Sequence, residues 1–212
     1  MKTPASPPHD CPLCPRLAAF RADNRKKHPD WFNGPVPSFG PLDARLAIAG
    51  LAPGLQGANR TGRPFTGDWA GDLLYATLLK LGLAKGVYDE RPDDTLELVD
   101  CRIVNSVRCV PPQNKPEPSE IRTCRQFLIG ELQMLPNVKT ILALGKIAHD
   151  SVLKTLNVRI AAHPFKHGAV YKIGKFNLIS SYHCSRYNTN TGVLTTKMFE
   201  DVVAKAKKLT EL

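Results

Sequence analysis

The stretch ARLAIAG, residues 44–50, runs into GLAPGLQGANRTGRPFTGD, residues 50–68, so a glycine-rich loop directly follows an apolar run. An apolar run without polar alternation is typical of a strand buried on both faces of a parallel sheet. The loop's glycines suit a backbone that approaches a ligand closely. The loop is not a Walker A sequence, because Arg63 and Pro64 follow Gly62 where Lys and Ser or Thr should stand, and it contains no G-x-G-x-x-G. Its ligand therefore has to be inferred from the rest of the chain.

Four nearly continuous apolar runs alternate with four helical patterns. The runs suit strands buried on both faces and cover residues 45–50, 102–107, 140–145 and 176–182. Apolar residues recur at helical spacing over residues 67–83, 118–135, 146–156 and 191–209. The alternation predicts a three-layer α/β/α fold with a mainly parallel, four-stranded sheet. Because ligands in such folds bind beyond the carboxyl ends of the strands, the loops after the first, second and fourth strands are expected to meet at one pocket.

The charge of the chain favours a polyanionic partner. Its 212 residues include 29 Lys and Arg against 19 Asp and Glu, a formal net charge of +10, which suits nucleic acid or an anionic membrane surface. No apolar run reaches the about 18 residues of a membrane span, and the start MKTPASPPHD lacks the apolar core of a signal peptide. We expect a monomeric, cytoplasmic protein associated with the nucleoid, with one domain, residues 11–212, after a flexible leader, residues 1–10.

The six cysteines require an account other than disulfides, which are disfavoured inside cells. Cys11 and Cys14 form a C-x-x-C pair, and Cys109 and Cys124 stand with fourteen residues between them. Four thiolates suit an iron–sulfur cluster or a structural zinc site, and the alternative is a redox C-x-x-C with ordinary buried thiols elsewhere. Spacing alone does not choose between iron and zinc. Cys101, at the start of a strand, is interpreted as a small buried hydrophobe.

Three residues near the predicted pocket suit a flat heterocyclic ligand. Asn105 lies inside an apolar run, where leaving a buried amide unpaired costs about 1–3 kcal/mol, so it binds backbone groups or faces a ligand. Phe65 offers a stacking face on a rigid loop, although a ring that plugs the core beneath the loop is the alternative. His183 follows the last strand and suits an electrophile or a proton carrier. A nucleophile pair of His183 and Cys184 is disfavoured, because neighbouring side chains on an extended chain point to opposite faces.

The chain resembles the iron–sulfur uracil-DNA glycosylases, specifically their type b branch, or family 5, in the CPLC leader and in GLAPGLQGANRTGRPFTGDWAG, NSVRCVPPQNKPEPSEIRTCRQFL, LALGKIAH and SYHCSRYNTNTG. The resemblance runs from Cys11 to the last helix. It implies a monofunctional DNA repair enzyme that hydrolyses the N-glycosidic bond of uracil in DNA and leaves an abasic site. Other deaminated bases such as hypoxanthine are expected to be substrates too. The resemblance also implies a [4Fe–4S] cluster bound by Cys11, Cys14, Cys109 and Cys124.

The resemblance further implies the residues of the base site. A flipped uracil would stack on Phe65 and pair its edge with Asn105. His183 and backbone N–H groups of residues 52–54 would stabilise the negative charge that gathers on the base as the glycosidic bond breaks. Asn105 and His183 are therefore expected to be catalytic, and the expected substrate-binding residues are Gly50, Ala52, Gly54, Phe65, Asn105 and His183.

The residue that activates water is expected at the other end of the glycine-rich loop. Many relatives in other branches carry a polar or acidic residue at the position of Ala52, whereas type b enzymes share its absence. Asp68 is then the nearest carboxylate that would position or deprotonate water, or balance the oxocarbenium charge of the sugar. The competing role for Asp68 is the N-cap of the following helix, and both roles are compatible.

The segment after His183 is expected to probe DNA, either as a wedge that fills the gap left by the flipped base or through phosphate contacts. A merely solvated loop is the alternative. The family usually has Pro after this histidine, whereas this chain has Cys184, which frees the local φ and restores an N–H. The expected DNA-binding residues are Arg63, Ser185, Arg186, Tyr187 and Asn188.

Two other functions compete with the glycosylase interpretation. The first is a catalytically inactive nucleic-acid-binding module that keeps the fold and the cluster. The second is a small-molecule α/β enzyme with a zinc site or a redox C-x-x-C. A brown colour with absorbance near 400 nm would argue against the second, and strand breakage by alkali after incubation with a uracil-containing oligonucleotide would argue against the first.

Overall fold

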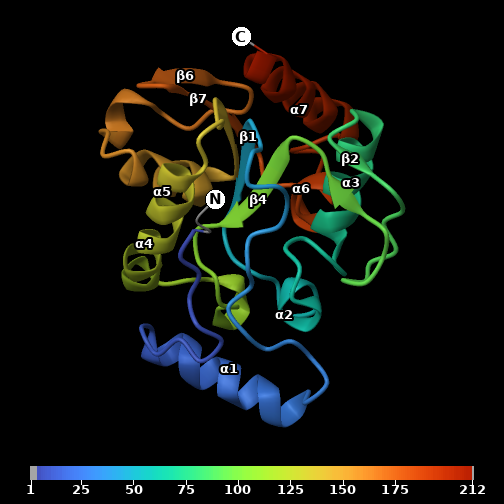
Figure 1. The fold of residues 1–212 in the computed structure, drawn as a ribbon, viewed down its shortest axis with the longest axis vertical. Helices are drawn as coiled ribbons and strands as arrows, with labels where there is room; N and C mark the ends of the chain where they lie inside the picture. Colours follow the sequence, from blue (N-terminus) through green and yellow to red (C-terminus); the bar gives the residue numbers. More distant parts are fainter. Residues whose placement is uncertain (1–3, 212) are drawn as a thin grey trace.

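The computed structural model describes residues 4–211 and is built on a five-stranded sheet in the order β4-β1-β5-β7-β6 (Figure 1). Four neighbouring strands are parallel, as the sequence predicted. The sequence missed the fifth, the antiparallel edge strand β6, which forms a hairpin with β7 around Gly174 and is short and partly exposed. The strands are β1 (Leu46–Gly50), β4 (Cys101–Asn105), β5 (Thr140–Leu144), β6 (Val170–Ile173) and β7 (Phe176–Ser181).

Four helices agree with the predicted patterns, but the last begins at Thr196 rather than at residue 191, after a turn at Gly192, whose φ of 73° is left-handed. Short helices over residues 58–61 and 186–190 stand where loops were expected. A helix near the N-terminus was not predicted, because its sequence PRLAAFRADNRKK has no apolar stripe. The helices are α1 (Pro15–Lys27), α2 (Ala58–Thr61), α3 (Trp69–Lys80), α4 (Pro118–Met134), α5 (Lys146–Thr155), α6 (Arg186–Asn190) and α7 (Thr196–Glu211). Short 3₁₀ turns occupy Pro112–Asn114 and Ile160–Ala162, and a small hairpin pairs β2 (Ala84–Lys85) with β3 (Glu97–Leu98).

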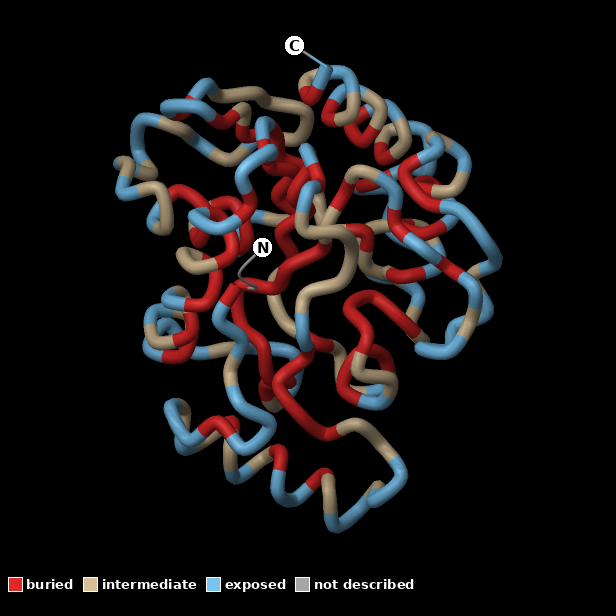
Figure 2. Tube along the Cα trace, viewed as in Figure 1, coloured by how far each residue is buried: buried red, intermediate tan, exposed pale blue. Residues whose placement is uncertain are grey.

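The two faces of the sheet are covered by different helices, which gives the predicted three layers. Leu46 and Ile48 of β1 pack towards α3 and α7, whereas Ala47 and Ala49 pack towards α4 and α5. The alternation follows from the two-residue period of a strand. Both faces are apolar because both are covered, and the buried part of the chain runs through the middle of the molecule (Figure 2). The carboxyl ends of the parallel strands are thereby left free to carry loops.

The segment before α1 partly lies outside the described residues. Residues 1–3 of the expected leader are not described, and residues 4–10 contain no helix or strand. Asp10 accepts a hydrogen bond from Arg25 of α1, and Pro4 is buried. The division into leader and single domain stays a prediction. Among residues 4–211, the structure has no helix with the length and apolarity that crossing a membrane requires.

Candidate active site and cysteine cavity

The loops that follow β1, β4 and β7 meet at one cavity of about 400 Å³, as the sequence predicted. A cavity of this size lies within the range of small-molecule sites. The start of α3 and the turn at residues 112–114 close its sides. The lining residues are Leu51, Ala52, Pro53, Gly54, Ala58, Phe65, Asp68, Trp69, Ala70, Asn105, Asn114, His183, Ser185 and Arg186.

Asn105 presents an unsatisfied amide to this cavity. It is the last residue of β4 and only 3 % exposed, and its Oδ1 has no hydrogen-bond partner among residues 4–211. Oδ1 lies where a side chain on Gly50 of the neighbouring strand would begin, so this close approach requires a glycine. A buried acceptor without a partner costs about 1–3 kcal/mol. The amide is therefore placed for a ligand rather than for its own backbone.

Phe65 forms a wall of the cavity in a strained conformation. Its φ is 53°, which is rare for a bulky residue and costs on the order of 1–3 kcal/mol. The ring is buried and lies against Gly50 on one side. Its centroid is 6.2 Å from that of the His183 ring, at an interplanar angle of 28°. The sequence left a ligand-facing ring and a core plug open, and the ring contributes to both the cavity wall and the apolar core.

His183 follows β7 and reaches the same cavity. Burial lowers the pKa of its imidazole, and the nearby Asp68 carboxylate acts in the opposite direction. Because the lowering prevails, the ring is neutral at pH 7 and keeps one N–H to donate. Gly145, with a φ of 93°, lies directly against the Cβ of His183 and leaves room for it.

Asp68 caps α3 and also lines the cavity. Its Oδ1 accepts a hydrogen bond from the Gly71 backbone N–H at 3.2 Å, so the expected N-cap is observed. Its other oxygen, Oδ2, lies over Gly54 and Gly57, where side chains would collide with it. One oxygen is thus committed to the helix, and the other lies against the glycine-rich turn. The role in activating water stays a prediction.

Two further lining residues complete the picture of the site. Ala52 lines the cavity and packs on its other side against the apolar cluster around the cysteines. Asn114 was not among the predicted site residues. It follows Gln113 in a turn where both have left-handed φ values, 56° and 57°. The sequence signal was an Asn in a proline-rich loop, since Asn tolerates this conformation well.

The segment after Cys184 is a short helix, α6, held against α3. Ser185 caps α6 by accepting from the Asn188 N–H, and the Asn188 amide donates to the His183 carbonyl at 2.8 Å. Trp69 of α3 donates to Thr189 at 2.9 Å. Ser185 and Asn188 therefore have local structural partners.

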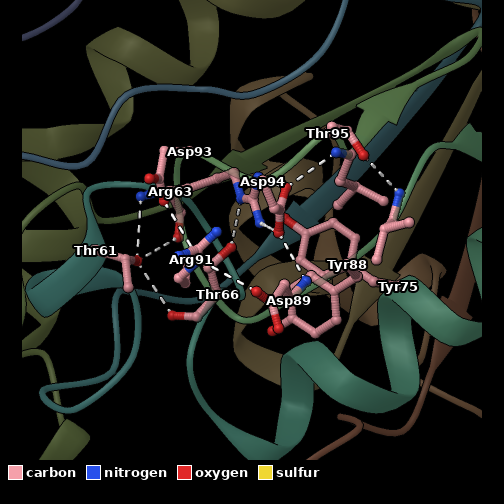
Figure 3. Close-up of polar contacts among 12 residues, drawn as sticks. Thr61, Arg63, Thr66, Tyr75, Tyr88, Asp89, Arg91, Asp93, Asp94 and Thr95 are labelled. Carbon is pink, nitrogen blue, oxygen red and sulfur yellow. Dashed lines mark hydrogen bonds and ion pairs between the residues drawn. The ribbon is translucent and has the colours of Figure 1, made fainter.

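The expected DNA contacts divide into outward and inward side chains. Tyr187 is 74 % exposed, and the Arg186 guanidinium lies over the Trp69 ring at 5.8 Å. Arg63, in contrast, is 6 % exposed and forms a bidentate ion pair with Asp94, both bonds being 2.7 Å (Figure 3). The expectation that Arg63 contacts DNA is therefore wrong. Its charge is neutralised inside the protein by Asp94, from the segment between β2 and β3, which sequence spacing did not connect to it.

Cys11, Cys14, Cys109 and Cys124 line a second cavity, which lies between α1 and α4. Burial raises the pKa of Cys109 to about 11 and that of Cys124 to about 12. Within residues 4–211, no group of three or more His, Cys, Asp or Glu side chains is arranged to hold one metal ion. Four cysteines around one space are compatible with an iron–sulfur cluster.

Donors around the cysteine cavity are aimed at sulfur. Arg21 of α1 is 5 % exposed and donates to Cys109 Sγ at 3.4 Å and to the Cys11 carbonyl at 3.0 Å. The Arg108 backbone N–H donates to Cys124 Sγ at 3.3 Å. No carboxylate among residues 4–211 forms an ion pair with Arg21. A buried cation without a carboxylate partner requires another anion, and thiolates bound to a metal cluster are anionic.

The two remaining cysteines lie elsewhere in the core. Cys101 is fully buried and donates to the Leu83 carbonyl at 3.2 Å, which confirms its interpretation as a small buried hydrophobe. Cys184 is also fully buried and packs against α3, with Sγ 3.5 Å from the Ala70 carbonyl. Burial raises its pKa to about 12, so the thiol is neutral and unsuited to act as a nucleophile.

Comparisons with known proteins agree with this arrangement. Residues 37–207 match the model of the uracil DNA glycosylase superfamily. The chain is 46 % identical over 209 residues to a type-5 uracil-DNA glycosylase of Thermus thermophilus, an alignment that covers 95 % of this chain and 94 % of that protein. It is 38 % identical over 201 residues to a type-5 enzyme of Pyrobaculum aerophilum, covering 93 % and 88 %. A type-4 uracil-DNA glycosylase of Thermotoga maritima is 29 % identical over 79 % of each chain. The chain belongs to the uracil-DNA glycosylase superfamily and, within it, to the type-5 enzymes.

Proposed function

We propose that this protein is a monofunctional DNA repair glycosylase, which hydrolyses the N-glycosidic bond of uracil in DNA and leaves an abasic site. The observation that carries the proposal is the buried, unpartnered Oδ1 of Asn105 in a cavity walled by Phe65. A nucleobase supplies what both residues lack, an edge that forms hydrogen bonds and a flat face. The type-5 relatives named above carry this activity in their names.

Base flipping brings the uracil into the cavity. A base inside a duplex cannot be reached, so the nucleotide has to be extruded at a cost of a few kcal/mol, which is least for a mispaired base. The net charge of +10 favours binding to the phosphates. Tyr187, exposed on α6 next to the cavity-lining Arg186, would fill the space that the base leaves in the stack, and Arg186 would contact the backbone.

The hydrolysis is favoured by donors aimed at the departing base. As the bond between C1′ and N1 lengthens, negative charge gathers on uracil N1 and O2 while the sugar becomes oxocarbenium-like. The neutral imidazole of His183 and the backbone N–H groups of Ala52 and Gly54 would donate to that charge. Gly50 leaves room for the Asn105 amide and the Phe65 ring, and Gly54 leaves room for the Asp68 carboxylate. Ala52 contributes no charged group to the cavity wall.

Asp68 would complete the reaction. Its Oδ2 lies at the cavity wall over Gly54 and Gly57, while Oδ1 is held by the helix. A carboxylate in this position would orient the attacking water and accept its proton, or stabilise the positive charge of the sugar. The fixed orientation that the helix cap provides costs nothing further at the moment of reaction.

The four cysteines of the second cavity would hold a [4Fe–4S] cluster. Cys11 and Cys14 come from the segment that leads into α1, Cys109 from the segment after β4, and Cys124 from α4. Bound there, the cluster would supply four metal–sulfur links between these elements and no group transfer in the hydrolysis. Through Ala52, which packs against the apolar cluster around the cysteines and also lines the base cavity, those links would support the wall of that cavity.

A single oligonucleotide experiment tests the proposal. The protein is incubated with a duplex that carries one labelled uracil and is then treated with alkali, which breaks the strand at an abasic site. We expect breakage at the uracil and none in an otherwise identical duplex with thymine. No breakage with uracil, in a preparation with four iron atoms per chain, would refute the glycosylase function and leave a non-catalytic binding module. Hypoxanthine in the same duplex tests the wider substrate range, and gel filtration tests the monomeric state.

A further inference from the structure

We propose that the buried ion pair of Arg63 and Asp94 positions Phe65, and thereby the stacking face of the base cavity, so that both are positioning residues of the reaction. This inference rests on the proposed function. It concerns residues outside the cavity, since neither Arg63 nor Asp94 lines it. Asp94 lies in the acidic segment between β2 and β3, which the proposed chemistry does not otherwise use.

The guanidinium of Arg63 is held on every side (Figure 3). Both of its terminal nitrogens donate to Asp94 at 2.7 Å, and its Nε donates to Thr66 Oγ1 at 2.8 Å. Three aromatic rings surround it, with centroids at 5.3, 5.7 and 5.8 Å from the guanidinium carbon; they belong to Phe39, Tyr75 and Tyr88. Such a planar, bidentate and stacked site is specific for arginine and is poorly served by lysine.

Asp94 organises its own segment around this pair. Its carboxylate oxygens also accept from the backbone N–H groups of Asp89 at 2.9 Å and Leu96 at 3.0 Å. The side chain is 2 % exposed. Every acceptor direction is thereby used by Arg63 or by the segment itself, so the ion pair fixes the position of residues 88–96 relative to Arg63.

Tyr88 connects the segment that Asp94 holds to the backbone of Phe65. Its hydroxyl accepts from the Gly67 N–H at 3.2 Å and lies 3.4 Å from the Phe65 carbonyl, to which it donates. The Tyr75 hydroxyl donates to the carbonyl of Pro64. The backbone on both sides of Phe65 is therefore gripped by side chains that surround Arg63.

The strained backbone at Phe65 explains why the contacts from Tyr75 and Tyr88 are needed. A phenylalanine with a φ of 53° does not hold this conformation by preference, and such outliers persist where the surroundings over-determine them. Without these contacts, the backbone of Phe65 would relax towards negative φ, and the ring would leave its place beside Gly50 and His183. The geometry thus links a buried charge pair to the surface on which a base would stack.

The test compares the single-turnover rate of uracil removal among variants. Arg63→Lys and Tyr88→Phe are each expected to lower it by about 10- to 100-fold, because a displacement of about 1 Å at a reacting site costs on the order of 100-fold. Affinity for undamaged duplex should be unchanged. Tyr171→Phe is the matched control. It also removes a hydroxyl that donates to a backbone carbonyl, but Tyr171 lies on the edge strand β6 and its acceptor is Pro164. Its rate should equal that of the wild type.

A double-mutant cycle with Phe65→Ala separates positioning from general stability. If Arg63 acts through the Phe65 ring, adding Arg63→Lys to Phe65→Ala should lower the rate less than about twofold further. Additive losses, or wild-type rates in both Arg63→Lys and Tyr88→Phe, would overturn the inference. If Arg63→Lys does not fold, Tyr88→Phe and its own cycle with Phe65→Ala decide the question. Failure of the proposed function would look different, because the wild type itself would then leave uracil in place.

Discussion

The base cavity and the cysteine cavity lie on opposite sides of the same backbone, but they are built for opposite purposes. Asn105 faces the first, and Cys109, four residues later, faces the second. The base cavity contains a buried acceptor, Asn105 Oδ1, without a partner among residues 4–211, whereas two of the four sulfur atoms in the cysteine cavity, those of Cys109 and Cys124, already receive hydrogen bonds. The first leaves a polar group unpaired for a ligand that comes and goes. The second surrounds its space with fixed partners, as a permanent occupant requires.

The largest effect is expected from breaking the cysteine cavity. Cys109→Ser removes one of four thiolates, so we expect loss of the absorbance near 400 nm and of bound iron, together with a large loss of folded protein. Iron analysis and circular dichroism measure this. Cys101→Ser is the matched control, because it alters a buried cysteine outside that cavity. Equal iron content in the two variants would remove Cys109 from the set of ligands.

The next largest effect is expected from removing the Asn105 amide from the base cavity. Asn105→Ala should lower the single-turnover rate of uracil removal by about 100- to 1,000-fold while iron content and DNA affinity stay unchanged. Asn177→Ala is the control, since that amide, on β7, donates to the Leu209 carbonyl away from the cavity. A rate reduced equally by both substitutions would mean that Asn105 acts through stability alone.

Asp68 sharpens the comparison within the base cavity, because its two oxygens have separate tasks. Asn is about as good an N-cap as Asp, so Asp68→Asn should leave the melting temperature nearly unchanged. The rate should fall on the order of 100-fold if the carboxylate activates water. An unchanged rate together with an unchanged melting temperature would assign Asp68 to the helix cap.

Replacing Arg21, the cation beside the cysteines, should have a smaller effect, which is confined to iron retention in the cysteine cavity. Arg21→Met keeps much of the side-chain volume but removes the donor to Cys109. We expect iron to be lost to a chelator about tenfold faster, since hydrogen bonds from charged donors contribute about 1.5–3 kcal/mol. The rate of uracil removal per iron-loaded chain should not change. Arg25→Met, on the same helix, is the control, and iron loss at the same speed in both variants would contradict the role of Arg21.

The smallest expected effect is a change in pH dependence. Burial lowers the pKa of His183 from its ordinary value near 6.5, against the opposing effect of Asp68. The neutral form is therefore dominant at pH 7, and the rate should fall only when the pH drops below the lowered pKa. Asp68→Asn removes the opposing charge, so the acidic limb of the pH–rate profile should shift to lower pH. A shift to higher pH would contradict the neutral role of His183.

Much of the fold and of the base cavity could be predicted because it depends on local patterns. The four parallel strands follow from continuous apolar runs, and the convergence of three loops follows from the topology of a parallel sheet. Asn105 drew attention as an amide in an apolar run, and its Oδ1 is indeed unpartnered. The edge strand β6 and helix α1 were missed because the first is half-exposed and the second lacks an apolar stripe.

By itself, the sequence determined the layers and the convergence of three loops on one pocket, since these depend on spacing and periodicity. The grouping of four cysteines into one set was implied by the resemblance to the iron–sulfur glycosylases and did not follow from spacing. Only the tertiary structure decided which charged side chains are buried and which partners they contact. Arg63, read as a DNA contact, is buried against Asp94, 31 residues away, and Arg21 points at a thiol 88 residues away. A charged side chain is solvated or buried according to which distant partner the fold brings to it. Burying the charge costs free energy unless that partner compensates for the lost hydration. No local pattern contains that information.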